Sequence, residues 1–314
     1  MSRKQDFMKR HNLLWLTICA LFISPCWSQQ AAPTGMVPVS IVVSVEAKHG
    51  KEVPTVYKED VRVLQGKDRL QVTEWTPLQG GQAGLELFLL VDDTSDSSVS
   101  LQLDDLRKFI GAQPSTAAIG VAYMRDGTVD VRQDPTTDHA LAAKALRLPI
   151  SSSGAMSSPY LSITDLIKRW PPSKNRHEIF MVTSGIDALQ PGSLDTYLQD
   201  AVSHAQRAGV QVYSIFASHA GHRGHSFFQL NWGQSDLSQM GDATGGEAYF
   251  QGYQTPVAYA PFLDEFADRL QHQYRLTFLV KAGKKGEFRR IKLETEVPNA
   301  ELVAQEQVYV PPAR

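Results

Sequence analysis

The chain has 314 residues, of which 42% are hydrophobic and 20% are charged, and its formal net charge is −2. These proportions are those of an ordinary globular protein and exclude a disordered, collagenous or coiled-coil chain. The near-neutral charge also argues against a nucleic-acid-binding protein, because such a domain is expected to be distinctly basic.

Residues 1–28 have the pattern of a signal peptide. Four basic residues precede the short apolar run Leu13–Ile23, and a polar stretch follows Ser28. The apolar run is too short for a comfortable membrane span, and no second candidate span follows it. We predict cleavage after Ser28 and export to the periplasm or the extracellular space.

Both cysteines, Cys19 and Cys26, lie in this segment. The predicted mature chain therefore has no disulfide and no thiolate metal ligand. Its 27 basic and 32 acidic residues make it mildly acidic.

Residues 29–82 have a β pattern. Apolar residues in loose alternation predict strands at Val39–Val45, Val61–Leu64 and Leu70–Thr73. Gln79–Gln82 contains two glycines and is typical of a linker. We expect a small β element before this linker.

The middle of the chain, residues 83–273, alternates apolar strands with amphipathic helices. The predicted strands are Leu85–Val91, Ala118–Tyr123, Glu178–Thr183 and Val210–Phe216. The predicted helices are Leu101–Ile110, His139–Leu146, Tyr160–Trp170, Leu194–Ala208 and Pro261–Gln271. This alternation predicts an α/β domain with a doubly wound, mostly parallel sheet that helices cover on both faces.

Residues 274–314 return to a β pattern. Tyr274–Val280 and Arg289–Val297 predict a β-hairpin around the turn at Gly283–Gly286. We expect this hairpin to pair with residues 29–82, so that the two chain ends build a small flanking β domain.

The best-placed binding residues follow the first strand of the α/β segment. Asp93, Ser95 and Ser97 are spaced two apart, which puts three oxygen-bearing side chains on one side of an extended loop. Ligands of open parallel sheets bind at the carboxyl ends of strands, and hard cations such as Mg²⁺ prefer oxygen ligands. The structural alternative is that this loop caps a helix and makes turn hydrogen bonds.

An apolar strand that ends in Asp-x-Ser-x-Ser resembles the metal-ion-dependent adhesion site of von Willebrand factor type A (VWFA) domains. The resemblance is to an exported bacterial group of such domains and covers about residues 37–310, including Thr244–Tyr249 and Gln273–Phe278. It implies a VWFA-like fold and a bound Mg²⁺, Mn²⁺ or Ca²⁺ ion. It also implies that the ion binds an exposed carboxylate of a partner protein or cell-surface ligand.

The family supplies two further ligands, a Thr before a helix and an Asp after a later strand, and this sequence departs from both. It offers Ser157 and Ser158 in place of the Thr, and Ser184 stands where the family has Asp. A neutral hydroxyl in place of a carboxylate weakens a site for a doubly charged ion. Asp187 and Asp165 are the candidate substitutes for this carboxylate. The predicted metal ligands are Asp93, Ser95, Ser97, Ser158, Ser184 and Asp187.

A second candidate is the segment from His219 to Trp232, interpreted as a loop at the rim of the sheet. His219, His222 and His225 have a spacing of three residues, and imidazoles suit Zn²⁺ or Cu²⁺. The glycines between them favour a solvated loop over a metal site. For the aromatic residues that follow, Phe227, Phe228 and Trp232, packing beneath the rim is favoured over an exposed binding surface.

The chain has no nucleophile elbow, phosphate-binding loop or dinucleotide-binding glycine pattern, so we expect a binding protein and not an enzyme. The expected function is an exported module that binds a protein or a surface through the metal site. One alternative is a metal-independent structural or assembly protein of the cell envelope, and another is a metal-binding protein or metalloenzyme that uses the histidines. The sequence leaves the partner and the oligomeric state open.

Overall fold

The computed structural model of the protein describes residues 35–80, 83–95, 97–150, 156–190, 196–220 and 225–312, without the side chains of Ser97 and Ser98. The predicted signal peptide and its cleavage site lie outside these residues. The described residues belong to one compact unit, which contains an α/β part and a β part. None of the helices in the described ranges is long and apolar enough to cross a membrane.

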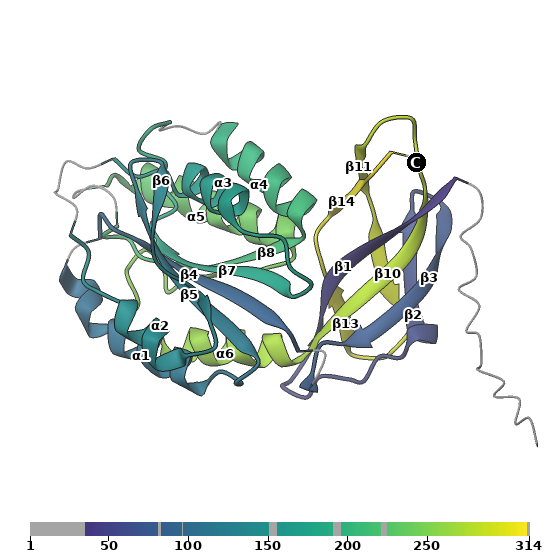
Figure 1. Ribbon diagram of the computed structural model, residues 1–314, viewed down its shortest axis with the longest axis horizontal. Coiled ribbons are helices and arrows are strands. Elements are labelled where there is room, and N and C mark those ends of the chain that lie inside the picture. Colours follow the sequence, from purple (N-terminus) through teal and green to yellow (C-terminus); the bar gives the residue numbers. More distant parts are fainter. Residues whose placement is uncertain are drawn as a thin grey trace, which may run out of the picture. The chain divides into compact units, whose positions relative to one another are not determined.

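The α/β part is built on a six-stranded sheet (Figure 1). Its strands in spatial order are β6 (Thr128–Thr136), β5 (Ala117–Arg125), β4 (Leu85–Asp92), β7 (Arg176–Thr183), β8 (Val210–Phe216) and β9 (Ala248–Tyr249). All neighbours are parallel except β5 and β6. The side chains of β4, β7 and β8 are buried almost throughout, as in a parallel sheet with helices on both faces. The predicted α/β fold is confirmed.

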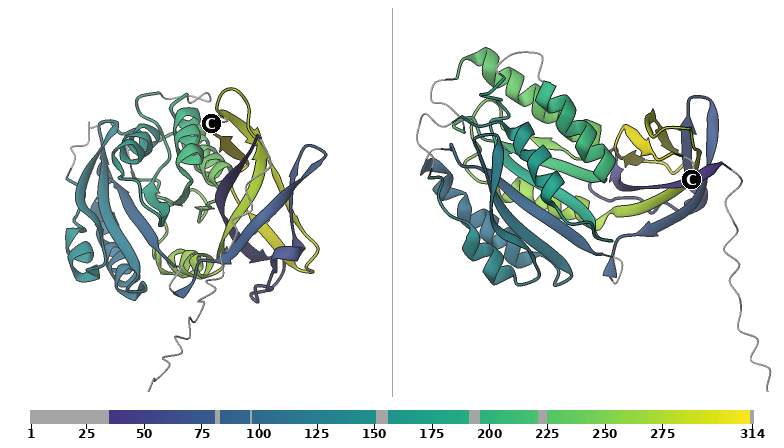
Figure 2. Two further views of the ribbon diagram at one scale, coloured as in Figure 1. Left: turned by 45° about the vertical axis from the view of Figure 1, so that its right-hand side comes forward. Right: turned by 45° about the horizontal axis from the view of Figure 1, so that its top comes forward.

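Helices cover both faces of this sheet. One face carries α1 (Leu103–Ala112), α2 (His139–Ala145) and α6 (Ala260–Gln271), and the other carries α3 (Pro159–Arg169), α4 (Thr196–Ala208) and α5 (Phe227–Thr244). Figure 2 shows the two helix layers from two further directions. Strand β4 contributes to both cores because its side chains alternate between the faces. Leu89 and Val91 pack with α1, α2 and α6, whereas Phe88 and Leu90 pack with α3, α4 and α5.

The β part combines strands from both ends of the described chain. β1 (Met36–Ala47) pairs antiparallel with β10 (Gln273–Lys281) along nearly its whole length. The sheet has the order β12 (Lys292–Thr295), β2 (Val61–Gln65), β3 (Asp68–Pro77), β10, β1 and β13 (Ala300–Val303), and β11 (Glu287–Arg290) pairs with β14 (Gln307–Val310). Its apolar side chains, among them Val43, Val63 and Phe278, form a third hydrophobic core.

Two predicted elements differ from the structure. The hairpin predicted between Tyr274–Val280 and Arg289–Val297 does not form, because β1 and β3 occupy both sides of β10 and the later strands pair elsewhere. The predicted rim loop from His219 to Trp232 becomes helix α5 at Phe227. Ser226 begins this helix, because its hydroxyl accepts the N–H of Gln229.

Candidate binding site at the carboxyl-end rim

Strands β4, β5, β7 and β8 are parallel, so their carboxyl ends meet on one side of the sheet. We call this side the carboxyl-end rim. The predicted ligands lie in the connections that follow β4, precede α3 and follow β7, and all of these connections belong to the rim. The short helix η3 (Ser97–Leu101) continues the connection after β4.

Asp92 and Asp93 point to opposite faces of the sheet. Side chains alternate along a strand, so Asp92 continues the series of Phe88 and Leu90 towards α3, α4 and α5. Asp93 continues the series of Val91 towards α1, α2 and α6. If the motif starts at Asp92 instead of Asp93, its carboxylate therefore lies on the other face of the sheet.

The buried Asp92 joins three segments of the rim. Its Oδ1 accepts the N–H of Thr94 at 3.0 Å and the Thr94 hydroxyl at 2.6 Å. Its Oδ2 accepts the hydroxyls of Ser157 at 3.3 Å and Thr183 at 3.0 Å. Burial raises the pKa of the Asp92 carboxyl, and the hydrogen bonds from Thr94, Thr183 and Ser157 oppose this rise.

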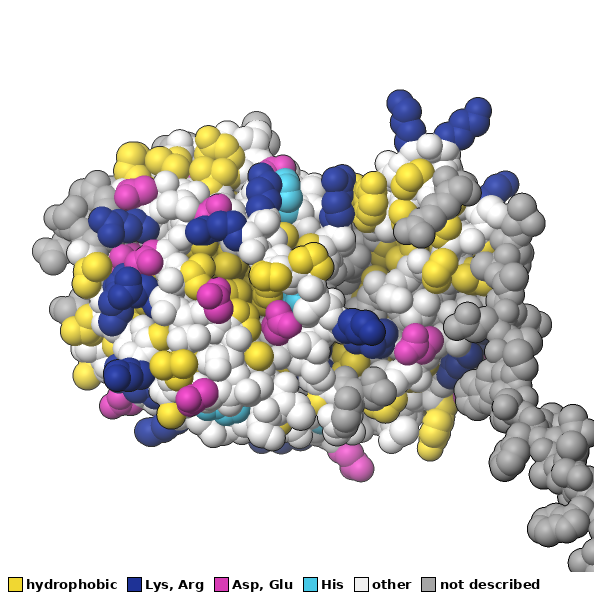
Figure 3. Space-filling view, viewed as in Figure 1, with side chains coloured by type: hydrophobic (Ala, Val, Ile, Leu, Met, Phe, Trp, Pro, Cys, Tyr) yellow, Lys and Arg dark blue, Asp and Glu magenta, His cyan; other side chains and the backbone are white. Residues whose placement is uncertain are grey.

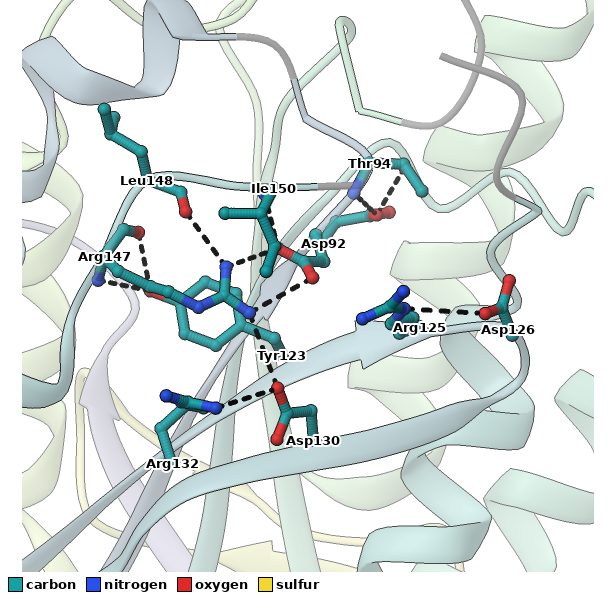
Figure 4. A network of polar contacts seen from close by, with 11 residues as sticks. Asp92, Thr94, Tyr123, Arg125, Asp126, Asp130, Arg132, Arg147, Leu148 and Ile150 are labelled. Carbon is teal, nitrogen blue, oxygen red and sulfur yellow. Dashed lines mark hydrogen bonds and ion pairs between the residues drawn. The ribbon is translucent and has the colours of Figure 1, made fainter. Parts of the chain in front are cut away.

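Asp93 is held by Arg147, which follows α2. The Arg147 nitrogens Nη1 and Nη2 lie 2.6 and 3.1 Å from Oδ1 and Oδ2 of Asp93, and the N–H of Ile150 donates to Oδ1 at 3.0 Å. Figure 4 shows the guanidinium over the ring of Tyr123, whose centroid lies 3.9 Å from the Arg147 Cζ. Burial lowers the pKa of Arg147, but the contacts with Asp93 outweigh burial and raise it. The predicted metal ligand Asp93 thus already has a cationic partner, bound at two points.

Ser95 lies at a small cavity of about 10 Å³ that His219, Thr255 and Tyr259 also line. The hydroxyls of Ser95 and Tyr259 have no hydrogen-bond partner among the described residues. A cavity of this size is large enough for one water molecule. The side chain of Ser97, the third residue of the predicted motif, lies outside the described residues.

Ser158 and Asp187 meet each other. The Ser158 hydroxyl caps α3 by accepting the N–H of Leu161 and donates to Oδ2 of Asp187. Oδ1 of Asp187 accepts the N–H groups of Leu189 and Gln190 at 2.8 and 3.0 Å. Burial raises the pKa of Asp187 against these hydrogen bonds. The hydrogen bond between Ser158 and Asp187 therefore joins the loop after β7 to the start of α3.

Ser184 is completely buried, and its hydroxyl accepts the N–H of Ile186 at 3.4 Å. The next residue, Gly185, has a φ of +69°, and a Cβ at this position would lie 2.4 Å from the carbonyl oxygen of Gly233 in α5. Only glycine allows this close approach in this conformation. The loop that carries Ser184 is therefore fixed against α5.

His219 and His225 have separate partners. Nδ1 of His219 lies 3.5 Å from the Thr255 hydroxyl, and Nε2 of His225 lies 3.0 Å from the carbonyl oxygen of Ala220. His222 lies outside the described residues. Trp232 is 37% exposed on α5, while Phe227 and Phe228 are 60% and 69% exposed. The favoured prediction, that these aromatic residues pack beneath the rim, is wrong.

The structure thus brings together residues that the sequence interpretation missed. Asp92, Thr94 and Thr183 converge with Ser157, and the alternation of β4 from Phe88 onwards contained the signal for the first of them. Arg147 had no such local signal, because it is 54 residues away from Asp93 in the sequence.

The oxygens around Asp92 suit a hard cation by type but supply little charge. The hydroxyls of Thr94, Ser157 and Thr183 donate to the carboxylate, and the Thr183 hydroxyl also accepts the N–H of Gly185 at 3.3 Å. Among the described residues, however, no group of three or more His, Cys, Asp and Glu side chains could hold a metal ion. Carboxylates are the main ligands of Ca²⁺ and Mg²⁺ in proteins, so this donor set does not fit such an ion well. The predicted Mg²⁺, Mn²⁺ or Ca²⁺ site stays a prediction.

No protein-family model and no curated protein matches the chain. Among solved structures, it is similar to BatB from Bacteroides thetaiotaomicron, with 11% identity, a TM-score of 0.43, and coverage of 60% of this chain and 97% of that one. An aerotolerance-related membrane protein from Bacteroides fragilis has 12% identity, a TM-score of 0.41, and coverage of 60% and 98%. VWA2, an ArnB paralog from Sulfolobus acidocaldarius, has 8% identity, a TM-score of 0.39, and coverage of 89% and 76%. The structural neighbours of the chain thus include a VWA protein.

Proposed function

We propose that this protein is an exported, non-catalytic module that binds another protein through the carboxyl-end rim. The proposal is supported by where large apolar side chains are exposed. Among the described residues, twelve large hydrophobic side chains are exposed, and ten of them belong to connections at this rim or to the first two turns of α5: Leu101, Leu148, Ile150, Met156, Leu189, Phe227, Phe228, Trp232, Tyr253 and Val257. The other two are Tyr57 and Leu141.

The exposed apolar side chains are therefore concentrated on one side of the α/β part. Large apolar side chains scattered over a surface need no explanation, but a gathering on one side is typical of interaction sites. Phe227 contacts Tyr253 at a ring-centroid distance of 4.9 Å, so part of the surface is an aromatic cluster. Figure 3 shows hydrophobic side chains at the left end of the α/β part. Aromatic residues are also the residue class most enriched at the centres of protein interfaces.

Within this proposal, binding does not require a divalent cation. Two observations favour this alternative over the cation-dependent one. Asp93 is neutralised by the Arg147 guanidinium, and Ser184 provides a buried, neutral hydroxyl at the position where the resemblance implied a carboxylate. Asp92 then acts as a structural group that holds the rim loops together through hydrogen bonds.

The experiment is affinity capture from an extract of the source cells with the purified protein as bait. Phe228→Asp and Ile150→Asp place a charge on the rim, while Tyr57→Asp and Leu141→Asp place the same charge on exposed apolar positions elsewhere. A partner that is retained by the wild type and by both controls, and lost from both rim variants, supports the proposal. Equal loss from rim and control variants contradicts it.

Capture is repeated in EDTA and in Mg²⁺. Equal recovery of the partner is expected in both buffers. Recovery in Mg²⁺ alone overturns cation independence and leaves the rim as the binding surface, so the two parts of the proposal are tested separately.

A further inference from the structure

On the opposite side of the molecule from the rim, one edge of strand β1 is open. Val45 donates its N–H to the carbonyl of His272, and Gly35 accepts the N–H of Ala282. In an antiparallel pair, alternate residues bond to the same neighbour, so the odd-numbered residues of β1 bond to β10 and the even-numbered ones point away from it. On that outer side, β13 pairs with Ser44–Ala47. No other strand among the described residues pairs with the outer side of residues 36–42.

The even-numbered residues of β1 carry the outward N–H and carbonyl groups of this open edge. The Val42 carbonyl accepts Nε2 of Gln211 at 3.4 Å, which closes the inner end of the edge. Ser40 keeps both an outward N–H and an outward carbonyl, and Pro38 has a carbonyl but no N–H. Pro38 and Ser40 are exposed. The edge therefore offers an N–H and a carbonyl at both Met36 and Ser40, a carbonyl alone at Pro38, and an N–H at Val42.

A cleft of about 650 Å³ lies against this edge. One wall is formed by Ser40–Val42, and the other by the end of α3 and the connections before β7 and β8, including Trp170 and Val210. Trp170 is fixed in this wall, because its Nε1 donates to Glu86 at 2.9 Å and its ring stacks on His177. The cleft is thus a formed feature with an apolar wall facing an unpaired strand.

The charges of the cleft have one sign. Its charged lining residues are Lys174, Arg176 and Arg275, and no Asp or Glu is among the described lining residues. Arg176 is buried and lies 3.5 Å from Glu178. Arg275 donates to the Lys174 carbonyl at 3.2 Å, while Lys174 is exposed. Burial lowers the pKa of His177, which also lines the cleft, against the attraction of Glu86.

We propose that this cleft binds an acidic segment of a partner protein in extended conformation, which adds a short strand to β1 at Ser40. Main-chain hydrogen bonds at an exposed strand edge supply affinity in this mode, and side-chain pockets supply selectivity. The segment would alternate acidic residues, attracted by Lys174 and Arg275, with β-branched residues that favour a strand. Pro38 limits the added strand to a few residues, because it removes a donor from the edge.

The test uses a short fluorescent peptide of sequence Glu-Val-Thr-Val-Glu and a twin in which Lys replaces both Glu residues. Fluorescence anisotropy with the purified protein measures binding. The acidic peptide is expected to bind and the basic twin to bind at least about tenfold more weakly, and added salt should weaken the acidic peptide. No binding of the acidic peptide, or equal binding of both peptides, overturns the proposal.

A matched pair of variants separates strand addition from simple attraction of charge. Ser40→Pro and Ser40→Ala both lose the Ser40 hydroxyl, which lies 2.8 Å from the Thr277 hydroxyl, but only Ser40→Pro also loses the N–H. Binding of the acidic peptide should fall about tenfold in Ser40→Pro relative to Ser40→Ala. Equal affinities would mean that Lys174 and Arg275 attract the peptide without a strand forming, which overturns the proposal.

If Ser40→Pro does not fold, amide hydrogen exchange of the wild-type protein tests strand addition instead. The Ser40 amide should exchange more slowly when the acidic peptide is present, and an unchanged rate contradicts strand addition. Phe228→Asp, at the carboxyl-end rim, should leave peptide binding unaltered. The outcome for this cleft is therefore independent of the function proposed for the rim.

Discussion

Asp92 and Asp93 are neighbours in the chain, and both are completely buried, but the protein stabilises them in different ways. Asp92 is surrounded by neutral donors, the hydroxyls of Thr94, Ser157 and Thr183. Asp93 meets the guanidinium of Arg147 at two points. Burial raises the pKa of Asp92 despite the hydroxyls around it, whereas the contacts with Asp93 raise the pKa of Arg147 and so favour the charged guanidinium.

Because side chains alternate along β4, these two neighbouring carboxylates reach different surroundings at the rim. The face of α3, α4 and α5 receives a hydrogen-bonded group that joins loops, and the face of α1, α2 and α6 receives an ion pair. Neither carboxylate is left exposed at the rim for a ligand, which agrees with the proposal that this surface binds through its apolar side chains.

The largest effect is expected from breaking the ion pair. Asp93→Asn removes the closer charged partner of the Arg147 guanidinium, which is 21% exposed, and leaves only Asp130 at 3.6 Å, so it should lower the free energy of unfolding by about 4 kcal/mol. Urea unfolding followed by circular dichroism measures this change. Asp130→Asn is the control, because Asp130 lies 3.6 Å from the same guanidinium and is 34% exposed, so it should cost less than about 1 kcal/mol. Equally small losses of unfolding free energy in both variants would show that Asp93 does not stabilise the Arg147 guanidinium more than Asp130 does.

A third buried carboxyl, Glu178, has an arginine neighbour and still has a raised pKa. Nε of Arg176 lies 3.5 Å from Oε1 of Glu178. Burial raises the pKa of Glu178 from 4.5 to about 7, against the attraction of Arg176. The folded protein therefore holds this proton more tightly than the unfolded chain does. The stabilisation is complete below about pH 4.5 and is lost as the pH rises through about 7.

The loss of unfolding free energy caused by Glu178 as the pH rises should be on the order of 3 kcal/mol. Glu178→Gln should lack this part of the pH dependence. The measurement compares the free energy of unfolding at about pH 5 and at about pH 8 in wild type and variant. Glu59→Gln, on an exposed side chain of the short helix η1 (Lys58–Asp60), is the control. An unchanged pH dependence in Glu178→Gln would show that Glu178 titrates normally.

Asp92→Asn should cost less than Asp93→Asn, at about 1 kcal/mol near pH 7. Asparagine has the same shape and keeps an oxygen that accepts from Thr94, and the surrounding hydroxyls can rotate. The substitution also removes a carboxyl whose pKa is raised because burial disfavours its charged form. That carboxyl stabilises the fold fully below its ordinary pKa of 3.8, and this contribution is lost as the pH rises. A cost as large as that of Asp93→Asn, measured by the same urea unfolding, would contradict the prediction.

The α/β fold could be predicted from sequence because its signal is local and repeated. The apolar strands Leu85–Val91 and Val210–Phe216 are buried on both faces, and the helices between them show a 3.6-residue period. The prediction of a hairpin after Tyr274 was wrong because strand pairing depends on distant parts of the chain. Its sequence has a strand pattern, but which strands lie on either side of β10 depends on segments more than 190 residues earlier in the chain.

The site was harder to predict for two physical reasons. Asp-x-Ser-x-Ser can be read from Asp93, but the same loop read from Asp92 gives Asp-x-Thr, and only the alternation of β4 decides which carboxylate faces α3. Arg147 could not be found from the motif at all, since its contact with Asp93 depends on how the chain returns to the rim after α2. The exposure of Phe227 and Phe228 was missed because the segment was interpreted as a loop, without the helix that presents them.

The smallest effect is expected from divalent cations. After treatment with EDTA, titration with millimolar Mg²⁺, Mn²⁺ or Ca²⁺ should leave the thermal unfolding of the wild type unchanged, because the carboxylates near the rim are already paired or surrounded by hydrogen-bond donors. An ion that bound the folded state at a hundredfold excess over its Kd would add about 2.7 kcal/mol, which is easily detected. A shift that disappears in Asp92→Asn but persists in Asp93→Asn would place a cation among Thr94, Ser157 and Thr183. The reverse pattern would mean that Asp93 exchanges Arg147 for the cation, as the sequence motif predicts.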